Sequence, residues 1–173
     1  GLARALMRAG RLDDAEARLQ PLRAHSAGTV WVEGLAAEIR LARNDPAGAI
    51  RILEAAQKQS PSTRSLSYAL ADARILGGRA DAAASELRRR IDNRSGDPRL
   101  WQLLSRAYAA LGKRTEQHRT QAEVYYLRGS LPAAIEQLEI ARRANDGDFY
   151  TLSAVDARLR ELKQRLLEEK RER

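Results

Sequence analysis

The sequence predicts an all-α fold in which about ten antiparallel helices stack in pairs and end in a C-terminal capping helix. Ala, Leu and Arg are abundant among the 173 residues and β-branched residues are scarce, which favours helix over strand. Turn-forming residues recur every 34 residues. Between them, apolar residues follow the i, i+3, i+7 spacing of a buried helix face, as in Trp101, Leu104 and Tyr108.

Three positions of the 34-residue repeat carry the residue types that a pair of packed helices needs. The first position ends a helix in a left-handed turn, and its residues are Gly10, Asn44, Gly78 and Gly112. The second position, five residues later, must be small because two helices cross there, and its residues are Ala15, Ala49, Ala83 and, as an exception, Gln117. The third position, nine residues after the turn, is apolar, and its residues are Leu19, Leu53 and Leu87.

The repeat places the helices along the chain in order. The expected ranges are 2–9, 12–24, 30–43, 46–59, 63–77, 80–93, 98–111, 114–128, 131–144 and 149–169. Asp45 and Asp97 each precede a proline, a typical helix start, and Ser130 with Pro132 begins another helix. Pro21 is the only proline expected inside a helix, which it should kink or end.

The regular repeat changes towards the C-terminus. Gly129 follows Gly112 after 17 residues, so segment 114–129 is a half-repeat step whose helix closes one repeat and opens the next, with Ala122 in a first-helix position. Residues 1–145 are expected to form the repeats, and residues 146–173 a capping helix with a frayed tail from Leu167. Gly1 corresponds to about the sixth position of a repeat. The first helix is therefore expected to be truncated, and the chain to be a piece of a longer protein.

A 34-residue period with this pattern of Gly, Ala and Leu is the signature of the tetratricopeptide repeat (TPR), a family that the chain resembles over most of its length. The resemblance implies a right-handed superhelix whose first helices line a concave groove for protein or peptide ligands. An aromatic side chain there can anchor a peptide and an arginine can pair with a carboxylate, although each can equally face water. The ten predicted groove residues are Arg4, Arg8, Glu38, Tyr68, Asp72, Gln102, Arg106, Arg119, Glu123 and Tyr126. One TPR subclass grips a C-terminal carboxylate with Lys and Asn residues, and these are absent from the equivalent positions.

Residues 99–163 resemble a narrower group. The segments that carry this resemblance are Arg99–Leu104, Arg106–Tyr108, Gly112, Gln121–Glu123, Tyr125–Tyr126, Gly129, Ala133–Ile135 and Asp156–Leu159. They are similar to the C-terminal TPR domain of the periplasmic zinc metalloproteases of Gram-negative bacteria, the β-barrel assembly-enhancing protease family. The resemblance implies a periplasmic docking module. Its partners would be outer-membrane barrel assembly components, misfolded clients and the protease domain of its own parent.

Catalytic residues are not expected in this chain. It has no Cys, its two histidines His25 and His118 are 93 residues apart, and it contains no HExxH motif. No cofactor is therefore expected, and the resemblance places zinc only in a protease domain outside this sequence. Gly77-Gly78 lacks a following Lys-Ser/Thr and is expected to end a helix rather than to bind phosphate.

Other readings of the sequence stay open. The net charge of +8 and the run Arg88-Arg89-Arg90 allow a basic helical-repeat nucleic-acid binder, but Glu86 and Asp92 interrupt the basic cluster, so nucleic acid is the less favoured partner. A freestanding TPR scaffold, cytoplasmic or secreted, with an unrelated protein partner is the main alternative. No apolar run reaches the length of a membrane span. Apolar residues near Gly1 to Met7 also predict self-association through the N-terminal end.

Overall fold

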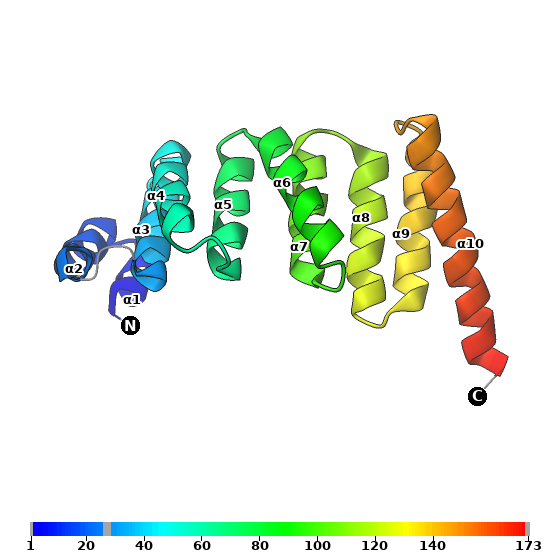
Figure 1. Ribbon diagram of the computed structural model, residues 1–173, viewed down its shortest axis with the longest axis horizontal. Coiled ribbons are helices and arrows are strands. Elements are labelled where there is room, and N and C mark those ends of the chain that lie inside the picture. Colours follow the sequence, from blue (N-terminus) through cyan, green and yellow to red (C-terminus); the bar gives the residue numbers. More distant parts are fainter. Residues whose placement is uncertain (1, 26–28, 172–173) are drawn as a thin grey trace. The chain divides into compact units, whose positions relative to one another are not determined.

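The computed structural model describes residues 2–25 and 29–171, and the regular elements within these ranges are ten α-helices (Figure 1). Their bounds are α1 Leu2–Arg8, α2 Leu12–His25, α3 Val30–Ala42, α4 Pro46–Gln59, α5 Arg64–Leu76, α6 Ala80–Asn93, α7 Pro98–Ala110, α8 Arg114–Leu127, α9 Leu131–Ala144 and α10 Phe149–Arg171. The predicted all-α fold of about ten helices is confirmed. Each predicted boundary lies within two residues of the observed one.

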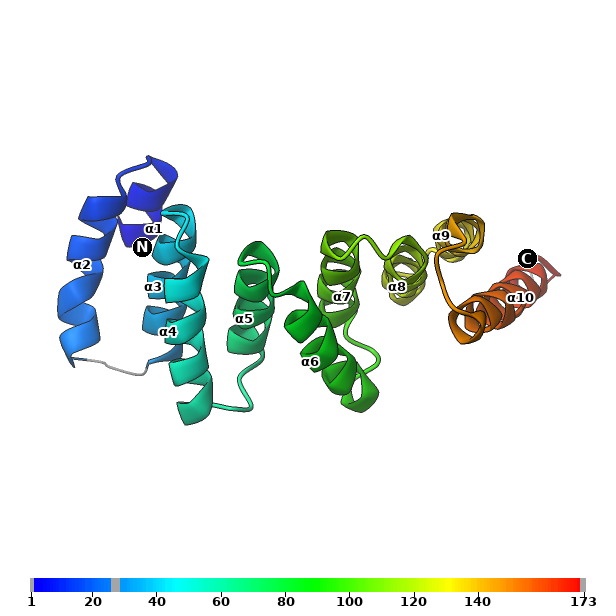
Figure 2. The same ribbon diagram turned by 90° about the horizontal axis from the view of Figure 1, so that it is seen from above.

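The helices form two compact units, unit 1 from Gly1 to Arg79 and unit 2 from Ala80 to Arg173. Within each unit, every helix packs against its neighbour in the chain (Figure 2). In unit 1, α3 also contacts α1 and α5, and in unit 2, α10 also contacts α8. First helices thus lie beside first helices inside a unit, which is the packing typical of stacked helical repeats.

The turn residues adopt the left-handed conformation that the repeat requires. Backbone φ is +73° at Gly10, +58° at Asn44, +73° at Gly78, +70° at Gly112 and +79° at Gly129. Side chains with a Cβ disfavour this region, which explains the choice of glycine at four of the five turns. Gly77-Gly78 therefore ends α5, as expected.

The small crossing residues are fully buried where paired helices meet. Ala15, Ala49, Ala83 and Ala134 are all inaccessible to solvent. Gln117, the exception, is only half-buried and lies on α8, which packs against both α7 and α9. The half-repeat step at 114–129 stays a prediction. Two apolar clusters form the core of unit 1, and a cluster of α8, α9 and α10 residues fills the C-terminal part of unit 2.

The predicted aspartate caps are present. Asp45 accepts a hydrogen bond of 2.7 Å from the Gly48 amide, and Asp97 accepts one of 3.0 Å from the Arg99 amide. Ser130 makes no side-chain cap at α9. The first turn of that helix is instead held by the backbone bond from the Ala134 amide to the Ser130 carbonyl.

Two local expectations were wrong, and a third is wrong in one of its two alternatives. Pro21 does not end α2, which continues to His25, and the kink stays a prediction. The expected fraying from Leu167 is not seen, since α10 is helical to Arg171 and residues 172–173 lie outside the described ranges. Trp101 is only half-buried, unlike Leu104 and Tyr108. Its indole N–H donates to the Ser95 carbonyl at 2.7 Å, which holds the ring at the edge of the core.

Candidate functional site

The predicted groove residues of unit 1 lie on the three neighbouring helices α1, α3 and α5. Arg4 on α1 makes a two-pronged ion pair with Glu38 on α3, with nitrogen–oxygen distances of 2.8 and 3.3 Å. Both side chains are exposed, so each balances the charge of the other at the surface. Arg8 is exposed one turn further along α1, and Tyr68 and Asp72 are half-buried one turn apart on α5.

In unit 2 the predicted residues lie on α7 and α8. Gln102 on α7 accepts a long hydrogen bond of 3.5 Å from Arg128 at the end of α8. Arg106 is exposed one turn after Gln102. Arg119 on α8 is half-buried, and its Nε–H is shielded from solvent without an acceptor among the described residues.

Glu123 and Tyr126, the last two predicted residues, are held by arginines of α10. Arg158 donates to both carboxylate oxygens of Glu123, at 2.9 and 2.8 Å, and its guanidinium carbon lies 4.4 Å from the centre of the Tyr126 ring. Arg165 also lies over that ring, at 5.5 Å, and donates to the Tyr126 hydroxyl. The tyrosine ring is thus a cation–π partner of two guanidinium groups.

The environment of Arg158 favours its charged form strongly. Burial by itself lowers the pKa of this guanidinium, but its hydrogen bonds to Glu123 and to Glu161 outweigh burial and raise the pKa above its ordinary value. Arg158 and Arg165 are not among the predicted groove residues, because residues 146–173 are expected to form a capping helix. The signal was present: Arg158 follows Glu123 by 35 residues, close to the repeat length, which places it beside Glu123 on the next first helix.

The histidines and the basic cluster of α6 have local partners. The described part of the chain contains no group of three or more His, Cys, Asp or Glu residues that could hold a metal ion. His118 lies 2.9 Å from the Gln137 side-chain oxygen, and His25 lies 2.8 Å from the Pro21 carbonyl, so both imidazoles have local structural partners. Glu86 pairs with Arg89 and Arg90, which reduces the charge of the basic cluster on α6.

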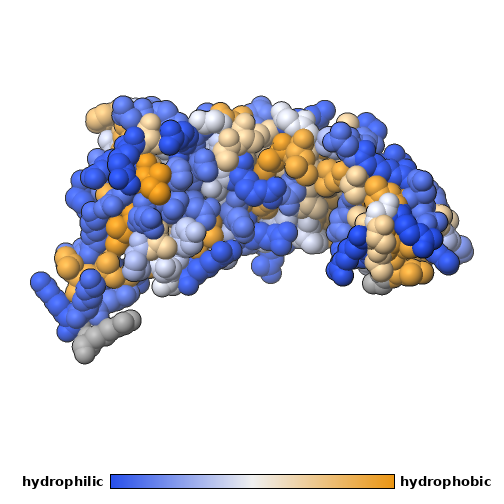
Figure 3. Space-filling model, turned by 180° about the vertical axis from the view of Figure 1, so that it is seen from behind, coloured by the Kyte–Doolittle hydropathy of each residue, from blue (hydrophilic) through white to orange (hydrophobic). Residues whose placement is uncertain are grey.

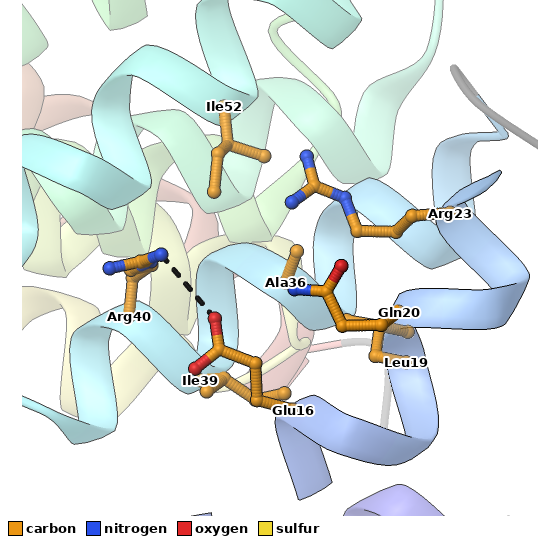
Figure 4. A pocket seen from close by; sticks show the side chains of 8 residues that line it. All are labelled: Glu16, Leu19, Gln20, Arg23, Ala36, Ile39, Arg40 and Ile52. Atoms are coloured by element: carbon orange, nitrogen blue, oxygen red, sulfur yellow. Dashed lines mark hydrogen bonds and ion pairs between the residues drawn. The ribbon is translucent and has the colours of Figure 1, made fainter. Parts of the chain in front are cut away.

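A small cleft between α2, α3 and α4 contains an ion-pair network (Figure 4). Glu16 of α2 lies 3.3 Å from an Arg40 nitrogen, and its other oxygen lies 2.6 Å from Arg43. The cavity volume is about 10 Å³, roughly the space for one water molecule. This network joins consecutive helix pairs and leaves no room for a ligand.

A larger apolar pocket of about 420 Å³ opens at the N-terminal end of unit 1. Its lining residues are Leu2, Ala3, Arg4, Arg18, Leu22, Trp31 and Leu35. Leu2 is 59 % exposed, whereas Leu70 and Leu104, which have the same position in later repeats, are 3 % and 2 % exposed. Hydrophobic surface is visible at this end of unit 1, on the right of Figure 3. The repeat position that is buried as Leu70 and Leu104 is thus exposed to solvent as Leu2.

None of the described helices is long and apolar enough to cross a bilayer.

Comparison with known proteins places residues 40–107 in the family described as tetratricopeptide repeat. β-Barrel assembly-enhancing protease from Escherichia coli K12 is 35 % identical over 164 residues, which is 95 % of this chain and 34 % of that protein. The Yersinia pestis protein of the same name is 33 % identical over 163 residues, with 94 % and 34 % covered. The chain therefore spans about a third of the length of these curated relatives.

A solved structure shows the same fold at low sequence identity. The structure described as "MamA 41-end from Desulfovibrio magneticus RS-1" matches with a TM-score of 0.65 and 15 % identity, over 94 % of this chain and 92 % of that one. The 34-residue repeat, the left-handed turns and the packing inside each unit agree with these comparisons. The chain is a tetratricopeptide-repeat domain, homologous over almost its whole length to the C-terminal third of β-barrel assembly-enhancing protease.

Proposed function

We propose that the chain is the docking and client-recognition domain of a periplasmic zinc-dependent metalloprotease that takes part in outer-membrane protein quality control. The homology to β-barrel assembly-enhancing protease over 95 % of the chain carries this proposal. In the proposal, zinc and the peptidase residues belong to a domain outside this chain, and the chain itself has no peptidase activity. Its partners are outer-membrane barrel assembly components, misfolded barrel proteins and the protease domain of its parent.

The ten predicted groove residues are proposed to contact the ligand. Gln102 supports this, because its side chain is exposed and can exchange hydrogen bonds with the backbone of an extended peptide. Arg158 and Arg165 of α10 have a positioning role, since they fix Glu123 and the Tyr126 ring from the neighbouring helix.

The N-terminal pocket is proposed as a contact for self-association or for another domain. The lining residues include Leu2, Leu22 and Trp31, which are exposed apolar side chains, and Arg18, which forms no ion pair with any described residue. Burial of such a pocket by a second copy would remove apolar surface from water. Sedimentation of the purified chain over a range of concentrations tests the self-association, and a monomer at all concentrations would refute it.

Binding of an unfolded outer-membrane barrel protein tests the main proposal. The labelled client is titrated with the purified chain, and affinity is read by fluorescence anisotropy. We expect Arg119→Ala and Gln102→Ala each to weaken binding, whereas Arg88→Ala, an exposed arginine on α6 outside the predicted groove, should leave it unchanged. Equal affinity of all three variants would refute the groove assignment. Binding to RNA or DNA that weakens steeply with salt would instead favour the nucleic-acid alternative.

A further inference from the structure

Two aromatic side chains stand in solvent at the start of α10. Phe149 is 78 % exposed and Tyr150 is 82 % exposed, and their rings meet edge to face with centroids 5.8 Å apart. The chain has only eight aromatic residues, one Phe, two Trp and five Tyr, and these two are its most exposed large hydrophobic side chains among the described residues. Single exposed hydrophobic residues are common, but an adjacent and paired set indicates a contact surface.

The loop that leads into this pair is held by hydrogen bonds at both ends. Asp146 accepts hydrogen bonds from the amides of Arg114 and Thr115, at 2.7 and 2.8 Å, and from the Thr115 hydroxyl at 2.5 Å. Asp148 accepts one of 2.7 Å from the Thr151 amide and so caps α10. Gly147 lies so close to Thr115 that a Cβ there would approach the threonine methyl within 2.9 Å. These bonds fix the backbone that leads into the aromatic pair, which lowers the entropy cost of binding.

Four basic residues lie on the elements that meet at this end of unit 2. Lys113 and Arg114 lie at the start of α8, next to the α9–α10 loop, and Arg142 and Arg143 lie in the last turn of α9 before that loop (Figure 1). All four are exposed, and none of them forms an ion pair with a residue that the structure describes. The two aspartates at this end direct their carboxylates to backbone amides. Lys113 also interacts through its charge with Asp148, and Arg142 and Arg143 with Glu139, so the four cations exceed the three nearby carboxylates of Asp146, Asp148 and Glu139 by one.

We propose that this end of unit 2 is a docking surface for an acidic segment of a partner protein that carries an apolar anchor residue. The anchor packs on the rings of Phe149 and Tyr150, and neighbouring carboxylates pair with Arg142, Arg143, Lys113 and Arg114. The surface lies outside the ten groove residues, so it goes beyond the proposed function and can be tested separately from it.

The probe is a short synthetic peptide in which glutamates flank a single phenylalanine, labelled with fluorescein and titrated with the full chain. Fluorescence anisotropy should show binding that weakens as salt is added. The double variant Phe149→Ser, Tyr150→Ser should lower affinity at least about tenfold. The double variant Arg142→Glu, Arg143→Glu should lower affinity similarly and flatten the salt dependence. Leu167→Ser, which replaces an exposed apolar residue elsewhere on α10, is the matched control and should bind like the wild type.

Amide NMR of the chain with the peptide shows where binding occurs. Shifts at the start of α8 and α10 are expected, and circular dichroism confirms that the variants, all changed at exposed positions, remain folded. The proposal is overturned if the wild type does not bind, if Leu167→Ser loses as much affinity as the aromatic variant, or if the shifts lie elsewhere. Two other outcomes also overturn it: aromatic-dependent binding to phosphatidylglycerol vesicles in place of the peptide, and aromatic-dependent self-association in place of either.

Discussion

Replacing Asp146 with alanine tests how the chain joins α8 to the end of α9. The change removes the acceptor for two backbone amides and for the hydroxyl of Thr115, a fully buried residue. A hydrogen bond of this kind contributes about 0.5–1.5 kcal/mol, and loss of a helix cap costs about 0.5–2 kcal/mol. Asp146 is exposed and water replaces part of what is lost, so we expect a loss of about 2 kcal/mol in the free energy of unfolding.

Thermal unfolding followed by circular dichroism measures this loss. For a chain of this size, about 2 kcal/mol corresponds to a fall in Tm of roughly 4–8 °C. Asp92→Ala on α6 is the matched control, since Asp92 is exposed and makes no hydrogen bond with a described residue, and its Tm should stay near that of the wild type. A Tm for Asp146→Ala within a degree or so of the control would refute the reasoning.

The same carboxylate makes stability depend on pH. Its hydrogen bonds, first the one from the Thr115 hydroxyl, hold the pKa of Asp146 below the ordinary aspartate value of 3.8. The folded state therefore binds the proton less readily than the unfolded state. The contribution of Asp146 is fully present above pH 3.8 and is lost as the pH falls through the lower, folded-state pKa. The difference in Tm between wild type and Asp146→Ala should shrink over that acid range. A constant difference would show that the ionised carboxylate is not responsible.

The remaining predictions concern the core, the α8–α10 ion pair and a turn. Ala122→Asp buries a charge at a fully enclosed position and should cost more than about 3 kcal/mol in urea unfolding, so a wild-type transition would disprove the assigned register. Arg158→Ala leaves the Glu123 carboxylate unpaired and should lower the free energy of unfolding by about 1–3 kcal/mol. The double variant with Glu123→Ala should recover part of this loss, whereas strict additivity of the two single losses would show that the pair is not coupled. Gly112→Ala should lower the free energy of unfolding by about 1 kcal/mol, because the backbone φ there is +70°. Gly34→Ala inside α3 should raise it by about 0.5–1 kcal/mol, because an added Cβ meets nothing within 4 Å. Equal effects of the two glycine changes on Tm would contradict the turn assignment.

Sequence alone predicted the features that backbone geometry imposes. The left-handed turns demand glycine or asparagine, and the helix crossings demand alanine, so both positions are visible as residue types at a fixed spacing. Because that spacing also fixes which residues belong to the first helices, the helices that carry the ten groove residues could be predicted as well. The ends of helices were predictable to within two residues for the same reason.

Contacts between distant, irregular parts of the chain were not predictable in this way. Asp146 lies 32 residues from Arg114, in a loop outside the repeat, and no local pattern shows that its carboxylate caps α8. Arg165 lies 39 residues from Tyr126, away from the repeat length, so no repeat position predicts its bond to the tyrosine hydroxyl. Trp101 was expected in the core because apolar spacing ignores the indole N–H, which needs an acceptor and finds one in a loop carbonyl at the edge.

Hydrogen–deuterium exchange of the whole chain, with and without an unfolded outer-membrane barrel polypeptide, tests the central proposal most directly. Binding through the predicted groove should slow exchange in the first helices α1, α3 and α5 of unit 1 and in α7 and α8 of unit 2, while α2, α4, α6 and α9 keep their free rates. Unchanged exchange in all segments, or slower exchange confined to α2, α4, α6 and α9, would contradict it.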